Sequence, residues 1–205
     1  MRAFGFGLNL SLSKGEAVKL TQHQIARAVD NPSLPPPGLS FMPPSSAPLR
    51  QIHGTVVALD GRGVLLRGPP GAGKSDLALR LIDRGARLVA DDRVELSAGR
   101  GRVLAWAPPA LAGLIEVRGL GVVSVPHRKA AEIVLVVDLV KPERIERMPG
   151  SGRGPERCVL AGRSLPRLRL APFEASAPVK LRLALAQAAQ AARTKDRTRR
   201  RKRKP

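Results

Sequence analysis

The stretch LLRGPPGAGKSDLALRLIDRGARLVADDRVEL, residues 65–96, decides the fold of this 205-residue chain. It begins with a short apolar run, passes through a glycine-rich turn into a helical pattern, and ends in a second apolar run with two adjacent aspartates, Asp91 and Asp92. Between residues 74 and 84 the apolar side chains fall on one stripe of a helix, and Gly85 follows as a typical helix end. The stretch therefore predicts a strand, a loop, a helix and a second strand.

The glycine-rich turn matches the phosphate-binding pattern G-x-x-x-x-G-K-[ST], in the strand, loop and helix context that this pattern requires. Its glycines let backbone N–H groups surround a β-phosphate, and the first turn of the helix adds unpaired N–H groups and a positive dipole end. Lys74 can reach the β- and γ-phosphates, and the Ser75 hydroxyl can bind Mg²⁺. The predicted nucleotide-binding residues are Gly68, Pro69, Pro70, Gly71, Ala72, Gly73, Lys74 and Ser75.

Short strands alternate with helical patterns through the middle of the chain, which predicts an α/β fold. Strands are expected at 54–60, 63–68, 87–96, 102–108 and 131–140, and helices at 74–84 and 179–192. The predicted folded domain covers residues 51–192. Residues 1–50, which include a Pro- and Ser-rich linker at 31–48, and the basic tail at 193–205 are predicted to be disordered.

The net charge of +20 raises the question of nucleic-acid binding. Residues 193–205 contain nine Lys and Arg and one Asp, so this tail alone contributes +8. A run of this kind is expected to bind polyanions weakly and in a salt-dependent way. With no Tyr, one Trp and four Phe, the chain also offers few aromatic rings on which bases could stack. The composition argues against a dedicated nucleic-acid-binding domain.

Three features of the sequence predict a cytoplasmic protein. The longest apolar stretches, around residues 134–140, fall well short of the roughly 20 residues that a membrane span needs. The N-terminus lacks the basic, apolar and small-residue order of a secretion signal. Cys158 is the single cysteine, so no internal disulfide can form, which agrees with a reducing compartment.

An enzyme that transfers phosphate to a hydroxyl also needs a carboxylate for the metal and a base for the proton. Asp138 ends the apolar run IVLVVD, which is how a Walker B metal ligand looks. Asp91 and Asp92 end the strand expected after the first helix, and adjacent side chains on a strand point to opposite sides, so one of the two should face the phosphates. Spacing alone does not choose between these two places.

Two segments together resemble the catalytic domain of HPr kinase/phosphorylase, a bacterial enzyme that phosphorylates a serine of the phosphocarrier protein HPr. They are IHGTVVALDGRGVLLRGPPGAGKSDLALRLIDRGARLVADDRVEL, residues 52–96, and LIEVRGLGVVSV, residues 114–125. The second contains a variant of the family signature L-E-[IV]-R-G-L-G, with Ile115 in place of the first Leu. The resemblance is specific over residues 51–125 and weaker over 126–192. Residues 1–50 have no counterpart, so we expect the N-terminal domain of longer members to be missing.

The resemblance implies a role for each matched residue, on a P-loop fold like that of phosphoenolpyruvate carboxykinase. Lys74 and the glycine-rich loop would hold the phosphates of ATP. Ser75 and Glu116 would bind Mg²⁺. Asp92 would be the base that takes the proton from the substrate serine, and Asp91 would support it.

The resemblance also implies that His53 is an active-site histidine, because it precedes the P-loop serine by the distance found in the family. Arg147, in the sequence IERMPG, is the best match to an arginine near the transferred phosphoryl group. The family has no metal-binding carboxylate at the position of Asp138, which makes the Walker B interpretation the weaker one. Arg118, Gly119 and Gly121 of the signature either shape a turn or approach the nucleotide.

The function implied is an ATP- and Mg²⁺-dependent protein serine kinase that acts on an HPr-like phosphocarrier of the phosphotransferase system and so regulates carbohydrate metabolism. The family also implies a homo-oligomer, a hexamer. Relatives remove the phosphate again with a loop resembling P-V-x-x-G-R-N, but residues 177–186, APVKLRLALA, lack its Gly and Asn. The reverse phosphorylase activity is therefore doubtful. The alternative function is a small-molecule P-loop kinase or ATPase.

Overall fold

The structure is a computed structural model that describes residues 50–99, 101–147 and 156–202. The expected disordered segment and linker before residue 50 lie outside these ranges. The described strands are β1 (Arg50–His53), β2 (Thr55–Leu59), β3 (Arg62–Arg67), β4 (Arg87–Ala90), β5 (Arg93–Gly99), β6 (Arg102–Trp106), β7 (Leu114–Val117), β8 (Gly121–Ser124), β9 (Ala131–Leu139), β10 (Arg157–Leu160) and β11 (Arg163–Leu170). The described helices are α2 (Lys74–Asp83) and α3 (Ala177–Lys202), with short 3-10 turns η1 (Pro109–Leu111) and η2 (Pro142–Arg144).

The main sheet of the described chain is mixed and has nine strands, in the order β1-β5-β6-β9-β3-β2-β4, with β11 paired to β9 and β10 paired to β11. The strands β3, β9 and β11 run parallel, and their other neighbours are antiparallel. Because parallel strands end at the same edge, the segments that follow β3, β9 and β11 lie side by side. The first of these segments is the glycine-rich loop, so the topology brings residues after 139 and after 170 beside it.

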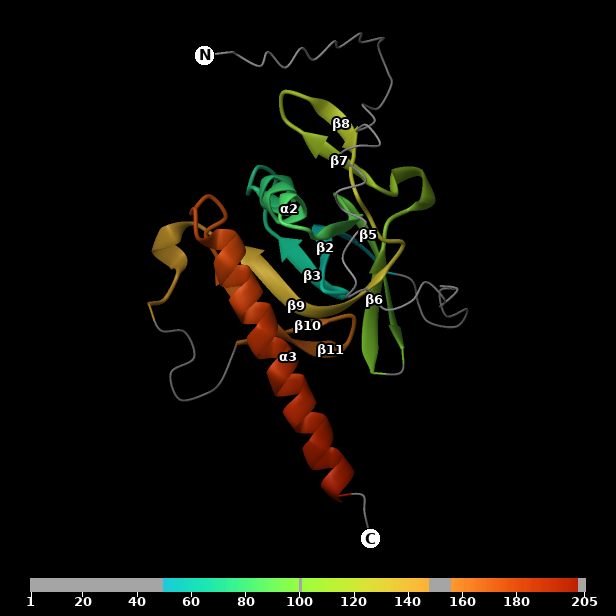
Figure 1. Ribbon diagram of the computed structural model, residues 1–205, viewed down its shortest axis with the longest axis vertical. Helices are drawn as coiled ribbons and strands as arrows, with labels where there is room; N and C mark the ends of the chain where they lie inside the picture. Colours follow the sequence, from blue (N-terminus) through green and yellow to red (C-terminus); the bar gives the residue numbers. More distant parts are fainter. Residues whose placement is uncertain (1–49, 100, 148–155, 203–205) are drawn as a thin grey trace, which may run out of the picture.

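Helices α2 and α3 cover one face of this sheet (Figure 1). Leu77 and Leu81 of α2 and Leu181 of α3 are fully buried in one core cluster with Leu66 of β3. Leu65 points to the opposite face and joins a second cluster with residues of β5 and β6. Burial of each such leucine contributes about 1.5–3 kcal/mol relative to an exposed position. The first cluster packs α2 against β3.

The expected strand at 87–96 is wrong, because the structure has two strands there. β4 pairs with β2, whereas β5 pairs with β1 and β6, so the chain turns a corner between them at Asp91 and Asp92. Asp92 adopts a left-handed backbone conformation with φ of 60°, and the Arg93 N–H donates to the Asp91 carbonyl at 2.7 Å. Asp is one of the few residue types that tolerates this conformation. The two carboxylates therefore belong to a turn and not to a strand.

Some of the remaining elements agree with the sequence, and others were not expected. The hairpin of β2 and β3, helix α2 and strands β6 and β9 lie where they were expected. Helix α3 begins at Ala177 and continues to Lys202, through ten residues for which we expected no secondary structure. These residues are mainly Arg, Lys and Thr, and Arg and Lys are strong helix formers. The strands β1, β7, β8, β10 and β11 had no counterpart in the sequence analysis. No helix in the described ranges is long and apolar enough to cross a membrane.

Candidate active site

The glycine-rich loop connects the end of β3 to the start of α2. Gly71 and Gly73 have φ of 77° and 81°, a backbone conformation that residues other than glycine rarely adopt. Lys74 is the first residue of α2, and its Nζ donates hydrogen bonds to the carbonyls of Gly68 at 3.0 Å and Pro69 at 3.1 Å. The side chain thus curls over the loop from which backbone N–H groups can surround a phosphate.

Asp91 connects three elements of the site. It is 8% exposed and accepts hydrogen bonds from Thr55 Oγ1 of β2 at 2.7 Å and from Ser75 Oγ of α2 at 3.1 Å. The backbone N–H of Glu116 in β7 donates to its other carboxylate oxygen at 3.3 Å. Sequence reasoning gave Asp91 only a supporting role. Its position as the first polar residue after the buried strand β4 is the one signal that could have revealed this contact.

The predicted Mg²⁺ ligands Ser75 and Glu116 are linked by the carboxylate of Asp91. The Ser75 hydroxyl and the Glu116 amide both bind its carboxylate, and the Glu116 side chain is exposed. Within the described residues, no three His, Cys, Asp or Glu side chains gather to form a closed metal site. This donor set fits Mg²⁺, which commonly takes one or two protein oxygens and completes its shell with phosphate and water.

The predicted base Asp92 and the predicted active-site His53 are neighbours. His53 Nδ1 lies 3.5 Å from Asp92 Oδ1, and the side chains are 84% and 73% exposed. The Gly54 N–H donates to the Asp92 carbonyl at 3.2 Å, which ties the end of β1 to the turn. The corner at residues 91 and 92 therefore directs one carboxylate toward Ser75 and the other toward solvent beside an imidazole.

Arg147 does not join this group. It is exposed and follows η2 on the segment that leaves β9, and it forms no ion pair with any residue of the described chain. Arg118 lies beside the loop, because a Cβ added to Gly71 would be 3.8 Å from its guanidinium nitrogen. Arg118 occupies the turn between β7 and β8, where Gly119 and Gly121 have φ of 84°.

Asp138 is engaged by two arginines. Its carboxylate accepts hydrogen bonds from Arg67 Nε at 2.7 Å and from Arg167 Nε at 2.5 Å, and its side chain is 15% exposed. Burial alone would lower the pKa of Arg67, but the hydrogen bond and charge of Asp138 raise the pKa above its ordinary value. The carboxylate that contacts the P-loop serine is Asp91. The geometry thus gives the Walker B interpretation of Asp138 no support.

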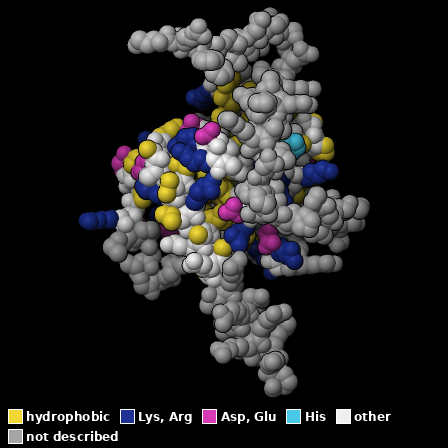
Figure 2. Space-filling view, in the orientation of Figure 1, with side chains coloured by type: hydrophobic (Ala, Val, Ile, Leu, Met, Phe, Trp, Pro, Cys, Tyr) yellow, Lys and Arg dark blue, Asp and Glu magenta, His cyan; other side chains and the backbone are white. Residues whose placement is uncertain are grey.

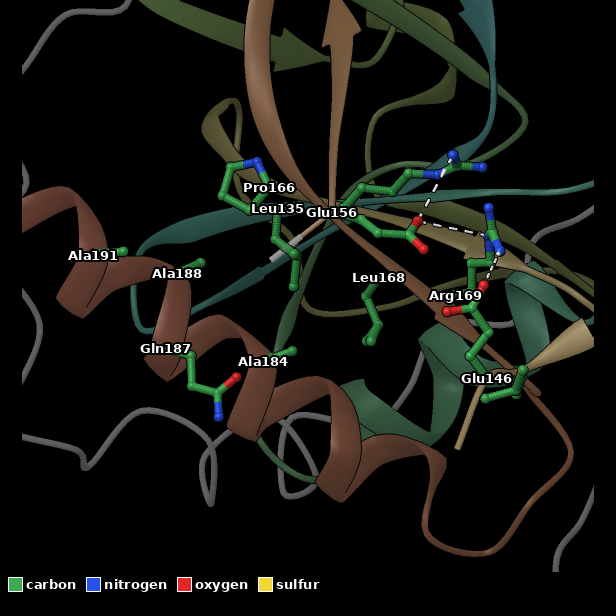
Figure 3. A pocket seen from close by; sticks show the side chains of 12 residues that line it. Leu135, Glu146, Glu156, Pro166, Leu168, Arg169, Ala184, Gln187, Ala188 and Ala191 are labelled. Atoms are coloured by element: carbon green, nitrogen blue, oxygen red, sulfur yellow. Dashed lines mark ion pairs between the residues drawn. The ribbon is translucent and has the colours of Figure 1, made fainter. Parts of the chain in front are cut away.

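Two cavities flank the parallel strands. One of about 700 Å³ lies beside the glycine-rich loop and is lined by Pro69, Pro70, Val140 and Phe173, among others. The other, of about 400 Å³, lies between α3 and the strands β9 and β11 (Figure 3). Figure 3 shows Glu156 and Arg169 at its rim, where they form an ion pair of 3.6 Å. No predicted site residue lines this second cavity, whereas the P-loop forms a wall of the first.

Charged side chains of both signs lie on the face of the molecule that Figure 2 shows. On the face shown in Figure 2, Lys and Arg are interspersed with acidic and apolar side chains. A dedicated nucleic-acid surface would concentrate basic residues on one face or along one groove.

Comparisons with known proteins give the family. The model of the HPr serine kinase C-terminal domain matches residues 45–177. The chain is 38% identical over 102 residues to HPr kinase/phosphorylase of Clostridium tetani (strain Massachusetts / E88), which covers 50% of this chain and 33% of that protein. It is also 38% identical over 128 residues to HPr kinase/phosphorylase of Streptococcus thermophilus (strain CNRZ 1066), which covers 58% of this chain and 41% of that protein. The chain thus spans well under half the length of these curated relatives.

A solved structure shows the same fold. It is the Hpr(Ser) kinase/phosphatase from Coxiella burnetii, which superposes with a TM-score of 0.65 at 24% sequence identity. The match covers 76% of this chain and 99% of that one. The α/β fold expected from the sequence is therefore confirmed. Since the family model spans more than half of the sequence, the chain belongs to the HPr serine kinase C-terminal domain family.

Proposed function

We propose that this chain is an ATP- and Mg²⁺-dependent protein serine kinase that phosphorylates an HPr-like phosphocarrier of the phosphotransferase system and so regulates carbohydrate metabolism. The observation that carries the proposal is the corner at residues 91 and 92. Asp91 holds the P-loop serine, Ser75, at 3.1 Å, and Asp92 is exposed beside His53 at 3.5 Å. One carboxylate thus serves the side that binds phosphate, and the other is open to an incoming hydroxyl.

The residues support a direct transfer. The backbone N–H groups of the loop and Lys74 would hold the β- and γ-phosphates, and Ser75 with Glu116 would hold Mg²⁺, which offsets phosphate charge when it is bound. Asp92 would accept the proton of the acceptor serine. The serine oxygen then bonds to the γ-phosphorus as the bond to the bridging oxygen of ADP breaks. His53 would orient the Asp92 carboxylate. Because the transition state of phosphoryl transfer is loose, positioning matters more than basicity.

The transfer is expected to favour the kinase direction. Residues 177–186, which the sequence analysis compared with the loop that relatives use for phosphate, lie inside α3. Lys180 forms an ion pair with Glu174, and Arg182 donates a hydrogen bond to the Arg84 carbonyl at 2.6 Å. Both cations are therefore engaged. We propose that phosphate-driven dephosphorylation is weak, and that Arg147 contributes to transfer in the forward direction.

A cytoplasmic location and assembly into a homo-oligomer, a hexamer, form part of the same proposal. Both follow from a phosphocarrier substrate and from the family. Light scattering of the purified chain would test the assembly.

Incubation of the purified chain with γ-labelled ATP, Mg²⁺ and the HPr-like proteins of its own organism tests the activity. We expect label on a serine of one phosphocarrier. A small-molecule P-loop kinase or ATPase is the competing function, and it gives no account of the signature segment that forms β7 and β8. Turnover on small hydroxyl compounds without transfer to any phosphocarrier would favour this second function.

A further inference from the structure

An exposed aromatic ring lies beside the glycine-rich loop. Phe173, in the segment between β11 and α3, is 71% exposed. A Cβ added to Gly73 would be 2.9 Å from Cζ of this ring and 3.3 Å from Cβ of Pro172. The edge of the ring therefore contacts the last glycine of the loop, while most of the side chain stays open to solvent.

The segment that carries Phe173 is tethered to helix α2. The guanidinium of Arg80 donates hydrogen bonds to the carbonyls of Pro172 and, at 3.4 Å, of Glu174. Asp76, one turn earlier in α2, accepts from the same guanidinium at 3.0 Å and so orients it. Since α2 starts directly after the loop, Arg80 fixes the ring relative to the phosphate-binding residues.

The ring forms a wall of the 700 Å³ cavity at the loop. This cavity lies at the carboxyl edge of the parallel strands β3, β9 and β11, the edge at which open α/β sheets bind their ligands. Much of its lining is apolar, including Pro69, Pro70, Val140 and Pro142, with Lys141 and Arg144 as its cations. Its volume is in the range of a nucleotide or drug-sized ligand.

We propose that Phe173 is the platform on which the nucleobase of the nucleoside triphosphate stacks, and that Arg80 is the residue that positions this platform. The inference rests on the proposed function, because it takes the triphosphate to lie on the loop. From there the nucleoside enters the adjoining cavity and meets the open face of the ring. An aromatic face accepts any base, and the apolar lining adds little hydrogen-bond selection, so the site takes nucleoside triphosphates as a class, without a strong preference for one base.

The inference is tested by comparing ATP with inorganic tripolyphosphate, which has the phosphates but no base. Titration calorimetry with Mg²⁺ would measure the affinity of both ligands for Phe173→Ala and wild-type protein. Loss of one stacked base is worth about 1–3 kcal/mol, so we expect ATP affinity to fall about 5- to 150-fold. Tripolyphosphate affinity is expected to stay unchanged. Val159→Ala removes an apolar side chain of similar exposure, 70%, from β10 and should change neither affinity.

A tryptophan at this position supplies a second measurement. Phe173→Trp should keep the affinity for ATP, and its fluorescence should be quenched by ATP but not by tripolyphosphate. The natural Trp106 in β6 is 8% exposed and provides a constant background. Arg80→Ala should lower the affinity for ATP and leave the affinity for tripolyphosphate unchanged. The double variant with Phe173→Ala should lose no more ATP affinity than the single variants. Arg80→Lys, which can still reach one carbonyl, should restore part of the affinity.

Three results would overturn the inference. Equal weakening of ATP and tripolyphosphate in Phe173→Ala would mean that the ring shapes the loop. Unchanged ATP affinity with a raised KM for the protein acceptor would mean that the ring contacts the acceptor. Additive losses in the double variant would remove Arg80 from the positioning role. If ATP binding depends on Phe173 but no phosphocarrier is labelled, the proposed function fails while the inference stands.

Discussion

The hydroxyl of Ser75 donates a hydrogen bond to the carboxylate of Asp91 at 3.1 Å, which joins the first turn of α2 to the end of β4. The same carboxylate also accepts from the fully buried hydroxyl of Thr55. Asp91 therefore stabilises the fold in addition to belonging to the candidate site.

Asp91→Ala is expected to destabilise the protein and to abolish transfer. The substitution leaves the Thr55 hydroxyl buried without its acceptor, which costs about 1–3 kcal/mol in the free energy of unfolding. Urea denaturation measures this loss. Asp92→Asn serves as the control, since its side chain is exposed and Asn also tolerates a left-handed backbone. Equal stability of Asp91→Ala and wild-type protein would contradict the prediction.

Lys74→Ala and Asp92→Asn should separate binding from transfer. We expect Lys74→Ala to lose nucleotide binding, because the side chain is the loop's cation for the β- and γ-phosphates. Asp92→Asn should keep binding and lower the transfer rate by about 10²- to 10⁴-fold, the contribution typical of a positioned base. Calorimetry and phosphate transfer in the same preparations measure the two effects.

Asp138→Asn is the matched control for Asp92→Asn. It should retain transfer, because this carboxylate is bonded to Arg67 and Arg167 and not to the P-loop serine. If Asp92→Asn transfers phosphate as fast as wild type and Asp138→Asn does not, then the Walker B interpretation is the correct one.

Two glycines with similar backbone conformations should respond differently to alanine. Gly73 and Gly85 have φ of 81° and 90°, so both substitutions strain the backbone. A Cβ at Gly73 also meets the ring of Phe173, whereas a Cβ at Gly85 meets nothing within 4 Å. Gly73→Ala should abolish ATP binding, and Gly85→Ala should cost about 1 kcal/mol of stability and keep ATP binding. Calorimetry and thermal unfolding distinguish the two, and equal ATP affinity would refute the prediction.

The reverse reaction should be slow. When the protein is incubated with serine-phosphorylated carrier and millimolar-range phosphate, we expect it to release little pyrophosphate. Lys180 is bound to Glu174 and Arg182 to the Arg84 carbonyl, so neither side chain can hold an incoming anion. A rate comparable with the forward reaction would overturn this. Loss of that rate in Lys180→Ala or Arg182→Ala would then identify the replacement anion site.

The thiol of Cys158 should react slowly with alkylating reagents at neutral pH. Burial raises the pKa of this thiol, so less thiolate is present than in a free cysteine at the same pH. The alkylation rate should rise with pH through the raised pKa, and unfolding in urea should increase the rate at constant pH. Mass spectrometry after timed iodoacetamide treatment measures the rate. A folded-state rate equal to the unfolded rate would contradict the expectation.

The parts of the fold that depend on local sequence could be predicted. The loop, helix α2 and the hairpin of β2 and β3 follow from glycine positions and from apolar periods of a few residues. The break at Asp91 and Asp92 could not be predicted, because β4 and β5 select different partner strands and only the assembled sheet shows this. β11 was missed since its run RSLPRLRL contains three arginines and a proline, and its pairing with β9 joins distant segments.

The candidate site divides in the same way. Ser75 and its neighbours were predicted from one contiguous motif. His53 and Asp92 were both named from the family resemblance, and they are neighbours in the structure. The contact of Arg118 with the loop and the tether from Arg80 to the Phe173 segment could not be predicted. Both join residues that are distant in the chain, and neither belongs to a repeating pattern.

The two-residue corner at Asp91 and Asp92 fixes the spacing between the phosphate side and the acceptor side of the site through covalent bonds. Neighbouring Cα atoms are about 3.8 Å apart in any trans peptide, so the two backbone positions cannot move apart. Loops such as the one between β5 and β6 can change in length without altering this spacing. An insertion of one residue between Asp91 and Asp92 would lengthen this spacing and move the acceptor side away from the phosphate side. The site therefore requires a corner of this length, although loops elsewhere in the sheet can be longer or shorter.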